Sequence, residues 1–270
     1  VLIAALFGMS VPTQSSAGSA ERRSCADVIF IGARGSGEDL DSRNKNMGAS
    51  VYYMANRMRS RLARYGETTD LIGLSYPALG VETLVPSTFQ INLLTKNPAA
   101  AFALYKKRNF DRYMNSIDKG TSSMRRAIVD YASDCQDSDL ILGGYSQGAM
   151  AIHQALNQLD AANSEAGYAV AGTLLLGDGD RAPGSRARSF GTAPRRGEGI
   201  RNYLRANDGR DLPAPEFSVS ICDEGDLVCD FDRSAFRHPL GAAAVHTRYL
   251  KSRRGVLDGA VDWLSEELFG

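Results

Sequence analysis

The stretch that decides the fold is Leu140-Ile141-Leu142-Gly143-Gly144-Tyr145-Ser146-Gln147-Gly148. Its apolar first half reads as a buried strand, and residues 147–159 follow with a helical pattern. The pattern Gly-x-Ser-x-Gly, centred on Ser146, stands at the junction. It is typical of a nucleophile elbow, a tight turn that exposes a serine hydroxyl above the end of a strand. Its glycines let strand and helix approach closely. The alternative interpretation is an ordinary strand-to-helix turn without chemistry.

Outward from this stretch, short apolar runs alternate with helical patterns along the chain. Such alternation predicts a parallel sheet with helices on both faces. Because no repeat or linker-like composition divides the chain, residues 21–270 are expected to form one α/β domain. A helix that includes Met124 is expected to begin near Thr121, a residue type that favours the N-cap. The predicted strands, about five in number, are residues 28–31, 71–76, 140–144, 169–177 and 217–221.

The first twenty residues differ from the rest. Residues 1–9 are apolar and residues 11–20 are small and polar, which predicts the end of an export signal. A disordered or tag-derived N-terminus is the other interpretation. The apolar run is too short to cross a bilayer, so we expect no stable membrane insertion.

The 31 basic and 31 acidic side chains of the whole chain cancel, so its formal net charge is zero. This balance argues against nucleic acid as a partner.

Four cysteines, Cys25, Cys135, Cys222 and Cys229, also favour export. An even number in an exported chain indicates two disulfides, and from the residues alone three pairings are open. Cys222 and Cys229 are close enough in sequence to close one short loop. The Cys-x₂-Cys spacing of zinc sites is absent, so no metal is expected.

A serine hydroxyl is a weak nucleophile and needs a base, normally a histidine that a carboxylate orients. His153 lies two helical turns beyond Ser146 and cannot fold back to it, so we expect a place on the helix face. His238 and His246 both follow the last predicted strand. His246, just before the last helical region, is the favoured base, and His238 is expected to be a loop residue.

Asp226 is the favoured carboxylate because it directly follows the strand at 217–221 and completes the chain order Ser–Asp–His of α/β-hydrolases. Asp178 and Asp180, after the strand at 169–177, are its rivals. Two amide donors must also hold the oxyanion of a tetrahedral intermediate. The backbone N–H of Gln147 supplies the first by position, and Ser36, in the glycine-rich loop after the first strand, is expected to supply the second.

Two insertions do not fit a minimal alternation of strands and helices. Residues 81–118 carry helically spaced apolar side chains from residue 110 onward and form either a lid over a cleft or extra helical packing. Residues 181–215 are rich in Arg, Gly and Pro and are expected to form an extended surface loop.

Several motifs in this order resemble the cutinase family. The resemblance runs from about Cys25 to the C-terminal helix, and the longer form is more similar to actinobacterial cutinase-like proteins than to compact fungal enzymes. One departure is Gly37, where fungal members usually have Thr. The motifs are Cys25-Ala26-Asp27-Val28-Ile29-Phe30-Ile31, Ala33-Arg34-Gly35-Ser36, Gly120-Thr121-Ser122-Ser123, Gly143-Gly144-Tyr145-Ser146-Gln147-Gly148-Ala149, Gly225-Asp226-Leu227-Val228-Cys229 and a late His-x-x-Tyr.

The resemblance implies a three-layer α/β/α hydrolase-type fold and a secreted, monomeric serine esterase that needs no cofactor. It implies cutin or other polyesters, lipids or short acyl esters as substrates, with lipase, phospholipase or acetylxylan esterase activity as alternatives. By position it makes Ser146, Asp226 and His246 the catalytic triad and Ser36 and Gln147 the oxyanion hole. Among the cysteine pairings it selects Cys25–Cys135 and Cys222–Cys229.

Two functions of other classes compete with an esterase. The pattern Gly32-x-x-Gly35-x-Gly37 follows a strand and suggests a nucleotide-binding loop, but its spacing differs from the dinucleotide fingerprint. An inactive cell-surface binding protein that keeps the fold is the second competitor. The presence of Ser, Asp and His in the required order argues against it.

Overall fold

The computed structural model describes residues 25–84, 86–203, 209–232 and 239–270. Within them, one parallel sheet has the strand order β2-β1-β3-β4-β6-β5. β3 therefore lies inside the sheet between β1 and β4, and Ser146 directly follows it. The strands are β1 (Val28–Ala33), β2 (Thr69–Gly73), β3 (Asp139–Tyr145), β4 (Val170–Leu176), β5 (Arg188–Phe190) and β6 (Ser218–Ile221).

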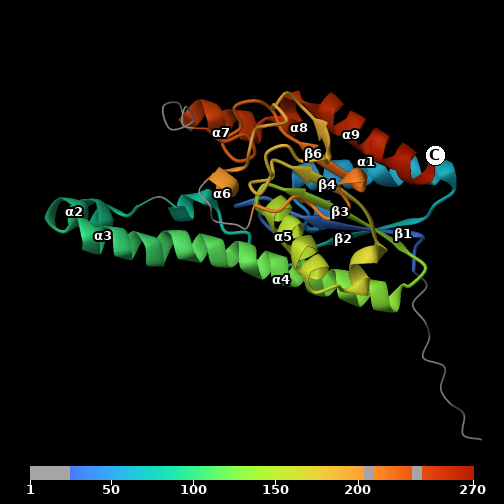
Figure 1. Ribbon diagram of the computed structural model, residues 1–270, viewed down its shortest axis with the longest axis horizontal. Helices are drawn as coiled ribbons and strands as arrows, with labels where there is room; N and C mark the ends of the chain where they lie inside the picture. Colours follow the sequence, from blue (N-terminus) through green and yellow to red (C-terminus); the bar gives the residue numbers. More distant parts are fainter. Residues whose placement is uncertain (1–24, 85, 204–208, 233–238) are drawn as a thin grey trace, which may run out of the picture.

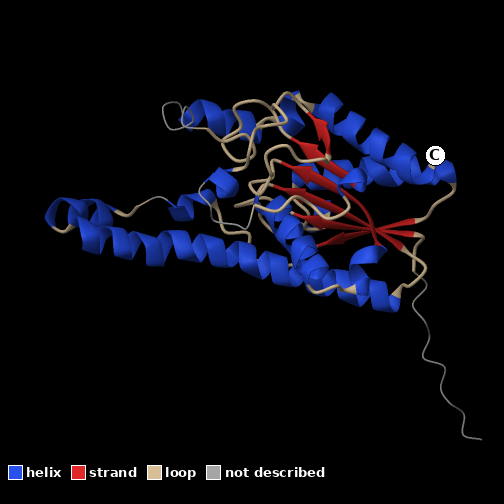
Figure 2. Ribbon diagram, viewed as in Figure 1, coloured by secondary structure: helices blue, strands red, loops and turns tan. Residues whose placement is uncertain are grey.

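Helices cover both faces of this sheet, which gives three layers (Figure 2). α1 and α9 pack on one face, and α4 and α5 pack on the other. The helices are α1 (Ala49–Tyr65), α2 (Thr88–Lys96), α3 (Pro98–Tyr105), α4 (Asp111–Asp134), α5 (Gln147–Ala161), α6 (Ile200–Tyr203), α7 (Pro239–Thr247), α8 (Tyr249–Ser252) and α9 (Arg254–Phe269).

The continuous apolar runs of the strands follow from this burial on both faces. In β1, Phe30 packs toward α1 and α9, whereas Ile29 and Ile31 pack toward α4 and α5. Each such side chain contributes about 2 kcal/mol when it is fully buried. The α/β class and the parallel sheet are confirmed, with six strands in place of about five.

The sixth strand, β5, lies in the segment at 181–215 that we expected to be an extended surface loop. It pairs in parallel with β6. α6 lies in the same segment, and the side chains of Arg181 and Arg201 are buried. The expectation is wrong for these parts, because Arg181 bonds the carbonyls of Cys229 and Pro194 and so anchors the segment to the body of the protein.

α4 does not begin near Thr121 as predicted. It starts at Asp111, and a π-helical turn at Lys106–Phe110 joins it to α3 (Figure 1). The local N-cap signal is overridden by packing, because Gly120 lies inside the helix where it meets Tyr76 and Ala151. A Cβ on Gly120 would come within 3.0 Å of each of them. Thr121 is buried in the same contact region.

Two disulfides join Cys25 to Cys135 and Cys222 to Cys229, the pairing that the resemblance implies. The first ties the segment before β1 to the end of α4. The second closes the loop after β6, which contains Asp226. The export-signal interpretation of residues 1–20 and the loop expectation for His238 lie outside the described residues.

Candidate active site

Ser146 occupies a strained turn between β3 and α5. Its backbone has φ 53° and ψ −114°, a conformation that costs an L-residue about 1–3 kcal/mol. A Cβ on Gly144 would lie 2.7 Å from Ala149 N, and one on Gly148 would clash with the carbonyl oxygen of Ala33. Both flanking glycines are therefore required by close backbone approach, as the elbow motif predicts.

Asp226 and His246 form a buried pair. His246 comes from α7 and Asp226 from the loop after β6, and Nδ1 of the histidine lies 2.9 and 3.0 Å from the two carboxylate oxygens. The hydroxyl of Tyr249 donates to Asp226 Oδ2 at 2.7 Å, and the backbone N–H of Val228 donates to Oδ1 at 2.7 Å. The carboxylate is thus fixed from several sides.

The surroundings keep this carboxylate ionised. Burial raises the pKa of Asp226, but the facing His246 and the hydrogen bonds from Tyr249 and Val228 outweigh it, so the pKa lies below its ordinary value. A carboxylate that accepts from Nδ1–H leaves Nε2 as the acceptor nitrogen of a neutral imidazole. Nε2 is buried and has no hydrogen-bond partner, Ser146 included, within the described part of the chain.

The imidazole is held over the carboxyl ends of β3 and β4. The ring of Tyr145 stacks on it with centroids 5.1 Å apart, and the Tyr145 hydroxyl donates to the carbonyl of His246 at 2.9 Å. A Cβ on Gly177, directly after β4, would lie 2.7 Å from His246 Cε1. Because Tyr145 precedes Ser146, His246 and Ser146 lie at the same edge of the sheet.

The two proposed oxyanion residues are linked through α4. The hydroxyls of Ser36 and Tyr113 lie 2.6 Å apart. Ser116, one turn further along α4, donates to Gln147 Oε1 at 3.0 Å. The loop after β1 and the first turn of α5 therefore have a common support, which the sequence motifs did not indicate.

The loop after β1 is held from its other side as well. The carboxylate of Glu38 accepts from the backbone N–H of Gly35 at 2.6 Å and from that of Ala49, at the start of α1, at 3.1 Å. Burial raises the pKa of Glu38. The buried guanidinium of Arg34 donates to the carbonyls of Glu38 and Tyr76. These hydrogen bonds thus hold the backbone amides of the loop after β1 in place before any substrate binds.

The rival carboxylates are engaged elsewhere. Asp178 Oδ2 lies 2.7 Å from Nδ1 of His153, and Asp180 accepts from Arg201 at 2.8 Å and from Gln154 at 3.0 Å. His153 accordingly lies on a buried face of α5, where it is ion-paired. Burial lowers its pKa, but the charge of Asp178 and the hydrogen bond to it raise the pKa to about 9.

The insertion at 81–118 divides into two parts. Its base packs beside the candidate site, where Tyr113 and Ile117 contact Met150 of α5. Its outer part, the α2–α3 hairpin, projects away from the sheet at the far end of α4 (Figure 1). The base is therefore helical packing, and the hairpin does not lie over the sheet.

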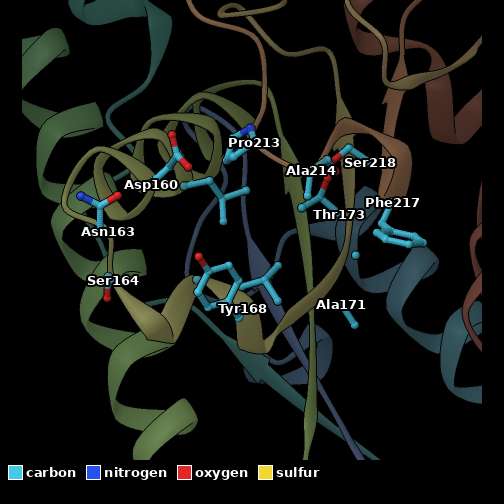
Figure 3. A pocket seen from close by; sticks show the side chains of 14 residues that line it. Asp160, Asn163, Ser164, Tyr168, Ala171, Thr173, Pro213, Ala214, Phe217 and Ser218 are labelled. Atoms are coloured by element: carbon cyan, nitrogen blue, oxygen red, sulfur yellow. The ribbon is translucent and has the colours of Figure 1, made fainter.

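A cavity of about 160 Å³ lies elsewhere, at the amino ends of β4 and β6 (Figure 3). Its lining includes Tyr168, Thr173, Phe217 and Asp160. Ser146 follows the carboxyl end of β3, and parallel strands place that end at the opposite edge of the sheet. None of the candidate catalytic residues lines this cavity.

The described residues contain no group of three or more His, Cys, Asp or Glu side chains arranged to hold a metal ion. In the same residues, no helix has the length and apolar character needed to span a membrane.

Comparison with known proteins identifies the family. Residues 24–268 match the sequence profile of the cutinases. The chain belongs to the cutinase family. It is 29% identical to Cutinase 2 of Fusarium vanettenii over 241 residues, which cover 86% of this chain and 73% of that enzyme. Cutinase of Fusarium solani subsp. cucurbitae is 29% identical over 237 residues, with the same coverage.

Solved structures agree on the cutinase fold. A cutinase-like protein from Cryptococcus sp. superposes with a TM-score of 0.60 at 23% identity and covers 90% of this chain and 96% of its own. An acetyl xylan esterase in an iodinated complex also gives 0.60, at 20% identity, covering 92% and 100%. Membership in the cutinase family makes this chain a carboxylic ester hydrolase.

Proposed function

We propose that this protein is a secreted serine esterase in which Ser146 is the nucleophile, His246 the base and Asp226 the carboxylate that orients it. One observation carries the proposal: the buried Asp226–His246 pair stands beside the strained Ser146 elbow and leaves Nε2 without a partner among the described residues. In the absence of substrate, catalytic hydrogen bonds such as the proposed one between Ser146 and His246 are often long, and they tighten only when substrate is bound.

The reaction then proceeds in two halves. Ser146 Oγ attacks the ester carbonyl carbon while His246 Nε2 takes the hydroxyl proton, and Asp226 stabilises the imidazolium. Backbone N–H groups of Gln147 and Ser36 hold the oxyanion. Collapse of the intermediate breaks the ester C–O bond, and the alcohol leaves with the proton from His246. Water repeats the sequence on the acyl-enzyme, which releases the acid and restores Ser146.

The substrates we propose are cutin-like polyesters, lipid acyl esters or short acyl esters. The support is the family and the names of the two Fusarium relatives, both of which are called cutinases. Acetylated xylan is the second candidate, because acetyl xylan esterases share the fold. Export is supported by the two disulfides and by the signal-like pattern of residues 1–20.

Ser146→Ala is the central test. We expect kcat on p-nitrophenyl butyrate to fall by about 10⁴-fold or more, as removal of a triad nucleophile does in other enzymes. A fluorophosphonate probe should label the wild type at Ser146 with one probe per chain. Wild-type turnover in Ser146→Ala would refute the assignment, and a chain that neither labels nor turns over would be an inactive binding protein. A panel of p-nitrophenyl esters, triglyceride, phospholipid, acetylated xylan and polyester film then ranks the substrates.

A further inference from the structure

The α2–α3 hairpin exposes large apolar side chains to solvent. Phe89, Ile91 and Leu94 of α2 are 67%, 54% and 55% exposed, and Phe102 of α3 is 68% exposed. Figure 1 shows the hairpin at the tip of a helical arm, away from the sheet and from both main cores. Soluble proteins rarely gather exposed apolar side chains in this way unless the surface binds something.

The composition of α3 sharpens this point. Pro98–Tyr105 has the sequence Pro-Ala-Ala-Ala-Phe-Ala-Leu-Tyr, in which no side chain is charged, yet Ala101 alone is buried in the described structure of this helix. A helix that is apolar on all sides normally lies in a core or in lipid. A helix that binds in a groove of a partner protein presents a single apolar stripe to that groove. α3 has no such stripe, because its apolar side chains lie on all sides.

The charges on the same segment have one sign. Residues 83–110 contain four basic residues and no Asp or Glu, although basic and acidic residues are equal in number over the whole chain. All four, Lys96, Lys106, Lys107 and Arg108, are exposed. The ion pairs found in the described parts of the chain include none of them.

We propose that the α2–α3 hairpin docks on an anionic lipid surface. The exposed apolar side chains enter the boundary between headgroups and acyl chains, and the four cations pair with the headgroup phosphates. This combination of apolar and basic side chains is the one that binds interfacial helices to membranes. It rests on no property of Ser146. If the proposed function holds, docking also brings a lipid ester toward the candidate active site. The hairpin leads directly into α4, and Tyr113 near the start of α4 contacts Ser36 of the proposed oxyanion hole.

Vesicle flotation with the Ser146→Ala protein tests the docking without any hydrolysis of lipid. We expect this protein to float with phosphatidylglycerol/phosphatidylcholine vesicles at low salt and to bind pure phosphatidylcholine vesicles at least tenfold more weakly. Adding Lys106→Glu and Lys107→Glu should weaken binding to the anionic vesicles about 30-fold or more, since each cation near such a surface contributes about a factor of five. Adding Leu94→Ser and Phe102→Ser should weaken binding to both kinds of vesicle about 100-fold.

The matched control carries Arg125→Glu and Arg126→Glu, the same charge change on exposed residues of α4 remote from the hairpin. It should bind anionic vesicles within about threefold of the parent. Equal loss in control and hairpin variants, or no binding of the parent to anionic vesicles, would overturn the proposal. The same hairpin changes in the wild-type background should leave p-nitrophenyl butyrate hydrolysis intact, which shows that the fold is retained. Because the parent protein in the vesicle experiment already lacks Ser146, a failure of the proposed function would not change the result of the docking test.

Discussion

The described residues include two buried aspartate–histidine pairs, and exchanging each aspartate for asparagine separates catalysis from stability. In one pair Asp226 faces His246, and in the other Asp178 faces His153. Both aspartates accept from an imidazole Nδ1, and Asp→Asn preserves the shape of the side chain in both. The two variants therefore make almost the same local change, the replacement of a carboxylate by an amide beside an imidazole. They differ in the role of that imidazole, which is catalytic for His246 and structural for His153 in this proposal.

In Asp226→Asn, the amide no longer holds the imidazole in the required tautomer or stabilises its cation. We expect kcat to fall about 10⁴-fold, as for the same change in other triads. The unfolding free energy should fall by only about 1–2 kcal/mol, because the bonds from Tyr249 and Val228 to a charged acceptor become bonds to a neutral one.

In Asp178→Asn, the buried His153 loses the carboxylate that holds its pKa at about 9. Without this counter-charge the buried imidazole loses its proton, so the unfolding free energy at pH 7 should fall by about 2–3 kcal/mol. The kcat of the folded fraction should stay within about twofold of wild type, because Asp178 does not contact His246.

Two measurements decide between the pairs: urea unfolding followed by tryptophan fluorescence, and p-nitrophenyl butyrate turnover normalised to the folded fraction. If the normalised kcat of Asp178→Asn falls as far as that of Asp226→Asn, the triad assignment is wrong. An unchanged kcat in Asp226→Asn would refute it as directly.

Three further predictions concern single side chains. The raised pKa of His153 stabilises the fold fully below pH 6.5 and progressively less as the pH rises through about 9, so its advantage over His153→Gln in urea unfolding should shrink by about 3 kcal/mol across that range. Tyr249→Phe removes the 2.7 Å donor to Asp226 and should lower the unfolding free energy by about 2–3 kcal/mol; an unchanged urea midpoint would contradict this. Gly177→Ala places a Cβ 2.7 Å from the proposed catalytic imidazole and should reduce kcat at least tenfold, whereas Gly184→Ala, at a similar positive φ with nothing within 4 Å, should leave kcat unchanged. Equal kcat values for the two glycine variants would show that the contact has no role.

Much of the fold could be predicted because its signals are local. Buried strands such as 28–31 and 140–144 are short apolar runs, and the elbow around Ser146 combines a glycine pattern with a change from strand to helix. Such features need no knowledge of the rest of the chain. The sequence does not predict strand β5, because its three residues have no apolar run and its position depends on pairing with β6.

The start of α4 shows the opposite case, in which a local signal misleads. Thr121 has a side chain suited to an N-cap, but the stripe that includes Tyr113 and Ile117 continues the helix toward its true start at Asp111. Burial of that stripe outweighs a cap, which is worth about 1 kcal/mol. Propensity at one residue loses to packing along a whole helix face.

The contacts of the tyrosines around the candidate site could not have been predicted from sequence, yet they explain much of the geometry of the site. Tyr145, Tyr249 and Tyr113 contact His246, Asp226 and Ser36 respectively. Burial raises the pKa of all three phenols, so each stays neutral and keeps its hydroxyl proton for hydrogen bonding. A site that passes one proton between a serine and an imidazole needs neighbours that position these groups without accepting that proton. Buried tyrosines meet both requirements. The elbow motif contains Tyr145 and the late His-x-x-Tyr spacing contains Tyr249, but neither motif indicates which catalytic group the tyrosine contacts.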